Sequence, residues 1–152
     1  MQSNDLQRIQ HILRYCDDIV DFMKRFGDYR QFITDRAYHN AVSMCVLQIG
    51  ELAGGLSSEF REETKESMQW GLIRGMRNWI AHAYNEMDDE IIWDTISNSI
   101  PLLRKFCIEI EERENIAATE KPSVIAEIRA ERERQHNNPQ PGKSKNKTEP
   151  EL

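Results

Sequence analysis

The chain is organised around one stretch, Gly75-Met76-Arg77-Asn78-Trp79-Ile80-Ala81-His82-Ala83-Tyr84. Its apolar residues, with those just before it, recur every three to four positions: Leu72, Ile73, Met76, Trp79, Ile80 and Ala83. That spacing predicts a core-facing helix, which we expect over residues 67–84. The polar residues of the stretch would then be held by a helix whose own neighbours anchor it in the core.

The four polar side chains of this stretch divide between two faces of the predicted helix. At about 100° per residue, Arg77 and Tyr84 lie on one face, two turns apart. Asn78 and His82 lie on an adjacent face, and about 140° separates Arg77 from His82. Joint action of Arg77 and His82 on one atom therefore requires a kink, the long reach of arginine, or a second copy of the helix.

The N-terminal segment predicts a long helix from about residue 4 to residue 26. We expect Ser3, Asn4 or Asp5 to cap it and Gly27 to end it. Its apolar residues alternate in steps of three and four: Leu6, Ile9, Leu13, Cys16, Val20 and Met23. A 3.5-residue period is typical of a helix-packing seam. With the separation of Arg77 and His82, this seam predicts a two-fold homodimer that joins both motifs in one groove.

A second helix is expected to begin with Thr34 or Asp35 as its cap and to end at Gly54-Gly55. Residues 41–47 in its middle are apolar on nearly all sides, which predicts a central position. Glu51 puts a carboxylate on this helix, and a buried lone charge is costly unless it is paired. We expect Arg77 or Arg74 to be its partner, although a direct part for Glu51 in the site is an alternative.

Residues 56–69 predict a polar connection with a short helical turn, and Asp88-Asp89-Glu90 opens a further helix that Pro101 should kink. Residues 119–135 predict a charged C-terminal helix and residues 136–152 a disordered tail, after a helical domain over residues 1–118. No β-branched alternation occurs. The predicted fold is all-α, an up-and-down four-helix bundle with an extra C-terminal helix.

Charge and cysteine content limit the class of protein. The net charge is −6, of which residues 1–119 carry −7 and residues 120–152 carry +1. Such an acidic body is not a general nucleic-acid binder, so any RNA contact must come from a few arginines. Three well-separated cysteines in apolar runs predict buried free thiols. Without a signal peptide or an apolar run near the ~20 residues that span a bilayer, we expect a soluble cytoplasmic protein without membrane contact.

The residue types favour metal-free chemistry and no cofactor. The four histidines lack paired metal-ligand spacing, and no nucleophile or phosphate-loop signature occurs. Acidic residues at 62–66 and 86–89 resemble the Mg²⁺-binding pairs of all-α nucleoside triphosphate pyrophosphohydrolases, which is the lesser alternative. Arg77 and His82 fit RNA cleavage better. Histidine can move a proton near neutral pH, and arginine can stabilise charge on a phosphate.

Residues 77–84 form an R-x4-H-x-Y pattern that closely resembles the signature of HepT-like toxins in the HEPN superfamily. The flanks agree, with Ile-Gly-Glu-Leu at 49–52, Trp70 before the motif and Trp93 after it. The resemblance covers roughly residues 5–110. The chain departs from it only in a longer C-terminal extension.

The resemblance implies a homodimeric helical protein that acts as a metal-independent endoribonuclease. Arg77 and His82 would be the catalytic pair, and Asn78 would assist or orient. The partner would be a minimal nucleotidyltransferase antitoxin, which neutralises the toxin by attaching AMP to the motif tyrosine, here Tyr84. A non-catalytic helical module that binds a nucleotidyltransferase is the alternative from another class.

Overall fold

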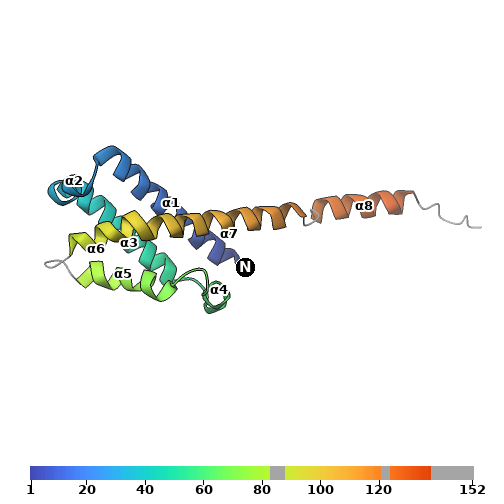
Figure 1. Cartoon of the computed structure of the whole chain (residues 1–152). Coiled ribbons are helices and arrows are strands. Elements are labelled where there is room, and N and C mark those ends of the chain that lie inside the picture. The colour runs from blue at the N-terminus through green and yellow to red at the C-terminus, as the bar shows by residue number, and fades with distance from the viewer. Residues whose placement is uncertain (83–87, 121–123, 138–152) are drawn as a thin grey trace, which may run out of the picture. The chain divides into compact units, whose positions relative to one another are not determined.

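A computed structural model describes residues 1–82, 88–120 and 124–137, with the backbone but not the side chain of His82. This part of the chain is helical and contains no β-strand, which confirms the all-α class (Figure 1). The chain divides into two compact units, Met1–Asn115 and Ile116–Leu152. The helices are α1 (Ser3–Phe26), α2 (Tyr29–Thr34), α3 (Arg36–Gly54), α4 (Ser58–Glu63), α5 (Trp70–His82), α6 (Asp89–Asp94), the π-helical turn η1 (Thr95–Ser99), α7 (Ile100–Glu120) and α8 (Val124–His136).

Helix α1 confirms the predicted N-terminal helix, and its apolar stripe packs into the core of the protein. Ile9 and Cys16 are fully buried in the core, and Leu13 and Met23 pack against it. The stripe is thus not the free dimer seam that the 3.5-residue period suggested. Gly27 ends the helix with a φ of +109°, a conformation that favours glycine.

The predicted N-terminal cap of α1 is wrong. Gln2 occupies the cap position and makes no side-chain cap hydrogen bond. Asp5 is instead buried, and its carboxylate accepts hydrogen bonds from the backbone N–H (2.8 Å) and the hydroxyl (2.6 Å) of Ser57. Ser57 is itself the N-cap of α4, so Asp5 fixes the start of that helix against α1. The Asp5 carboxylate therefore makes a long-range contact with Ser57, and α1 begins without a side-chain cap.

Helix α3 is central, as its apolar middle predicted, and packs against both α1 and α5. Asp35 is its N-cap and accepts hydrogen bonds from Ala37 N–H (2.9 Å) and Tyr38 N–H (3.2 Å). The short helix α2 was not predicted. It begins at Asp28 with reciprocal hydrogen bonds between Asp28 and Gln31 across the first turn.

Pro101 does not break the last long helix. It is the second residue of α7, immediately after η1, where the Ile100 N–H reaches back to the carbonyl of Thr95. The irregularity predicted at Pro101 therefore takes the form of a π-helical turn one turn earlier. Wider turns of this kind accommodate local disruptions of the i→i−4 pattern.

The core of the first unit joins side chains from α1, α3, α5 and α7, together with those of the shorter helices. Cys16, Cys45 and Cys107 are free and buried, as predicted. Burial raises the pKa of Cys45 to about 11 and that of Cys107 to about 12, so both thiols are protonated near neutral pH. In the described residues, no helix has the length and apolar character required to cross a membrane.

The second unit contains helix α8. Its apolar residues Val124, Ile125 and Ile128 are all exposed, and none of its residues is buried. The tail predicted from residue 136 falls almost entirely outside the described residues, which end at residue 137.

Candidate active site

Helix α5 carries the Arg77 motif and lies unusually close to α3. Ile73 and Ile80 anchor it in the core. A Cβ atom placed on Gly50 of α3 would lie 2.9 Å from Arg77 Cβ and 3.0 Å from Arg77 N. Side chains larger than glycine would therefore push the two helices apart. The glycine at position 50 brings the backbone of Arg77 directly against α3.

A groove of about 530 Å³ runs between α3 and α5. Its lining combines glycines with charged and polar side chains: Gly50, Glu51, Gly54, Gly55, Gly71, Arg74, Gly75, Arg77 and Asn78. The groove brings together Arg77 and Asn78, two of the residues predicted for catalysis. A concave site with a few convergent polar groups is the usual setting for ligand binding.

Arg77 and Glu51 form an ion pair across this groove, from Arg77 Nε to Glu51 Oε1. This confirms the partner expected for Glu51, but the carboxylate is not buried. The side chains are 51% and 44% exposed, so the pair adds little to the stability of the fold. Its effect is on position, because Glu51 holds the guanidinium at the groove where an incoming phosphate could replace the carboxylate.

His82 and Tyr84 are less fully placed. His82 is the last residue of α5, five positions after Arg77, and its side chain lies outside the described part of the chain. Tyr84 falls in the segment 83–87, also outside the described residues. The ~140° separation between Arg77 and His82 thus stays a prediction from helical geometry.

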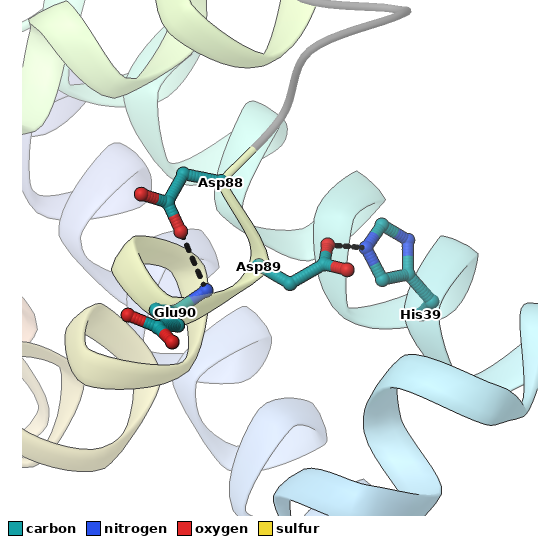
Figure 2. Close-up of polar contacts among 4 residues, drawn as sticks. All are labelled: His39, Asp88, Asp89 and Glu90. Carbon is teal, nitrogen blue, oxygen red and sulfur yellow. Dashed lines mark hydrogen bonds and ion pairs between the residues drawn. The ribbon is translucent and has the colours of Figure 1, made fainter.

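A second histidine, His39 of α3, points toward the carboxylate of Asp89, the first residue of α6 (Figure 2). His39 Nε2 and Asp89 Oδ1 are 2.7 Å apart. The His39 ring also stacks on Phe32, with ring centroids 4.8 Å apart and an interplanar angle of 26°. Asp88 accepts a hydrogen bond from the Glu90 N–H and caps α6. The first residue of α6 is therefore tied to α3, and no sequence pattern pointed to this contact.

Three of the acidic residues considered for magnesium have structural partners. Asp88 caps α6, Asp89 pairs with His39, and Glu62 pairs with Lys65. Within residues 1–82, 88–120 and 124–137, no three His, Cys, Asp or Glu side chains converge as metal ligands would. These roles do not support the pyrophosphohydrolase alternative.

A neighbouring face of α5, which shares Gly71 and Gly75 with the first groove, is apolar. A groove of about 730 Å³ lies between α5 and the η1–α7 region, and its lining includes Met76, Ile100 and Leu103. Three large apolar side chains on this groove are well exposed: Leu72 (68%), Leu102 (67%) and Trp79 (42%). Sequence periodicity had assigned Leu72 and Trp79 to the core. The helix instead turns them towards solvent, while Ile73 and Ile80 face inward.

A family model described as ribonuclease HepT-like matches residues 12–110, which include α3, α5 and the Arg77 motif. The chain belongs to the ribonuclease HepT-like family. This confirms the resemblance seen in the motif. The family is one of ribonucleases, so this HepT-like chain is an enzyme that cleaves RNA.

Relatives of this HepT-like protein occur in bacteria and archaea. A protein of Caldanaerobacter subterraneus subsp. tengcongensis, provisionally named an RNase, is 33% identical over 106 residues, which is 70% of this chain and 93% of the relative. One of Methanocaldococcus jannaschii with the same provisional name is 34% identical over 69% of this chain and 90% of its own length. A Thermococcus cleftensis protein provisionally named ribonuclease HepT is 25% identical over 59% of this chain and 86% of its own. No solved structure matches this chain.

The glycines of the HepT-like groove were missed as a group, although a signal was present. Gly50 and Gly54 are four residues apart on α3, and so are Gly71 and Gly75 on α5. Residues four apart share a helix face, so each pair leaves a strip of backbone bare. The sequence alone does not indicate that these strips meet along one groove.

Proposed function

We propose that this protein is a metal-independent endoribonuclease toxin that cleaves RNA with Arg77 and His82. The proposal rests on one observation. In a chain of a ribonuclease family, Arg77 of the motif lines an open groove, and Asn78 lines it too. Arg77 is half exposed, so a phosphate can reach its guanidinium. Its ion pair with the Glu51 carboxylate supports the proposal, because a phosphate can take the place of a carboxylate beside a guanidinium.

The chemistry requires only groups that this chain supplies. His82 accepts the proton of a ribose 2′-hydroxyl, whose oxygen attacks the adjacent phosphorus. The bond from phosphorus to the 5′-oxygen breaks, which leaves a 2′,3′-cyclic phosphate. The departing oxygen takes up a proton from solvent, and His82 releases to solvent the proton that it accepted. Arg77 stabilises the negative charge that grows on the phosphoryl oxygens, and Asn78 orients the phosphate by hydrogen bonding.

Regulation by a nucleotidyltransferase antitoxin is the second part of the proposal, and it rests on the motif position of Tyr84. AMP attached to the tyrosine oxygen would add a phosphodiester charge and a purine, with pyrophosphate leaving from ATP. If the helix continues through residue 84, as the sequence predicts, Tyr84 lies on the face of Arg77. The phosphate would then compete for Arg77 and the nucleotide would fill the groove. The modification would inhibit by charge and occupancy, without refolding.

Arg77→Ala and His82→Ala are each expected to abolish toxicity in cells at unchanged soluble expression. Arg77 is exposed and makes only a solvent-accessible ion pair, so its loss should leave the fold intact. Growth arrest on induction measures the effect, and Arg25→Ala, which removes an exposed arginine on α1, is the matched control. If the His82 variant still arrests growth, His82 has no part in the chemistry.

Tyr84→Phe is expected to resist neutralisation by the cognate nucleotidyltransferase and ATP. The variant lacks the oxygen that would receive AMP, while its remaining activity should still depend on His82. Intact mass after incubation with the partner and ATP measures the adduct. An AMP adduct of equal yield on the Phe variant would place the modification elsewhere. If the nucleotidyltransferase binds both the wild-type protein and the Tyr84→Phe variant, but neither of these two cleaves RNA, the non-catalytic module is the better description.

A further inference from the structure

The arginines around the motif groove extend beyond the motif itself. Arg74 of α5 lines the groove beside Arg77, three residues and about 4.5 Å along the helix axis away. A Cβ atom on Gly54 would lie 3.9 Å from Arg74 Nε. A Cβ atom on Gly55 would lie 2.6 Å from Arg8 Nε and 3.3 Å from Arg8 Cζ, so the guanidinium of Arg8 from α1 lies against Gly55, one of the residues that line the groove.

Two of these three arginines are not neutralised. Arg77 pairs with Glu51, but neither Arg8 nor Arg74 has a carboxylate within 4.0 Å among the described side chains. Seven of the ten arginines in residues 1–119 lack a carboxylate partner among the described side chains, so what distinguishes Arg8 and Arg74 is their position beside the groove. Two such arginines at one groove create a local positive potential on an acidic protein.

The floor of the groove is open to a ligand. Cβ atoms on Gly71 and Gly75 would meet nothing within 4 Å, so the backbone of α5 is uncovered at these positions. The volume of about 530 Å³ falls within the usual range for small-molecule sites, about 300–1,000 Å³. A chain of phosphates could therefore lie against the glycine backbone while the arginines bind it from the rim.

We propose that Arg74 and Arg8 bind the RNA backbone on one side of the cleaved bond, as successive phosphate contacts that lead away from Arg77. The inference rests on the proposed ribonuclease function and extends it. Arginine is suited to this role because its planar guanidinium matches phosphate oxygens and stays charged. Arg74 and Arg8 are positioning residues that touch phosphates distant from the reaction, whereas Arg77 is at the reacting phosphate and exchanges Glu51 for it.

Binding is tested with a fluorescein-labelled 12-nucleotide RNA in which every ribose is 2′-O-methylated, so that it cannot be cleaved. Arg8→Gln and Arg74→Gln are each expected to weaken binding about three- to tenfold in low salt. Because each removes one phosphate contact, each should also reduce the slope of log affinity against log salt by about 0.7. Arg25→Gln on α1 is the charge-matched control, about 26 Å along the helix from Arg8, and should bind like wild type.

Cleavage separates positioning from catalysis. Arg8→Gln and Arg74→Gln should lose more activity on the 12-nucleotide substrate than on a dinucleotide with a single phosphodiester. On the longer substrate the loss should lie mainly in KM rather than in kcat. Wild-type affinity and salt slope in the double variant would overturn the inference while leaving the proposed nuclease intact. If the Arg8 and Arg74 variants bind RNA more weakly but the wild-type protein never cleaves RNA, the proposed function is wrong. The groove would then still be an RNA-binding site.

Discussion

Gly50 determines how Arg77 is held. Its missing side chain lets α5 approach α3 until Arg77 Cβ lies only 2.9 Å from where a methyl carbon on Gly50 would be, and the same approach brings Glu51 to the guanidinium. Glu51, the residue after Gly50, therefore pairs with the arginine that lies against Gly50. The pairing of Glu51 could be predicted from the cost of an unpaired carboxylate, whereas the close approach at Gly50 could not, because it depends on the register of two helices.

Gly50→Ala and Gly75→Ala are expected to change stability in opposite directions. The methyl group at position 50 would clash with Arg77 Cβ and with the carbonyl of Ile73, at 3.2 Å, and should lower the free energy of unfolding by about 1–3 kcal/mol. At position 75 it meets nothing within 4 Å, so helix propensity should raise stability by up to about 1 kcal/mol. Urea denaturation measures both. A Gly50 variant as stable as wild type would show that the helices are not in tight contact there.

At the scale of the elements, the long helices could be predicted and their irregularities could not. The stripe of α1, the Asp35 cap of α3 and the Gly54 end are local signals that read directly as helix boundaries. Asp5 was misassigned because its partner, Ser57, is 52 residues away. The outward rotation of Trp79 likewise depends on packing against other helices, which no local pattern records. The irregularity at Pro101 was predicted, but not its form as a π turn that ends two residues earlier.

The same limit applies to the site. Arg77, Asn78, His82 and Tyr84 were found from a short pattern, and the structure places the first two at a groove. His39 and Asp89 were missed because they are 50 residues apart and each looks ordinary in its own segment. Arg8 was missed as part of the groove for the same reason, since only the fold brings the first turns of α1 to the end of α3.

At the scale of the whole molecule, we propose a homodimer, with a different interface from the one suggested by the α1 stripe. That stripe is used in the core, and the exposed apolar groove lined by Leu72, Trp79 and Leu102 supports an interface on α5 instead. A two-fold contact there would bring two copies of the motif helix together and ease the separation of Arg77 and His82. Sedimentation equilibrium at assay concentrations tests the dimer, and a fully active monomer would contradict it.

The measurement that tests the central claim most directly is cleavage of mixed cellular RNA by the purified protein with excess EDTA present. The account predicts cleavage that EDTA does not reduce, with 2′,3′-cyclic phosphate ends, and its loss in both Arg77→Ala and His82→Ala at an unchanged melting temperature. Cleavage that stops in EDTA and returns with Mg²⁺, or that persists undiminished in the His82 variant, would contradict it.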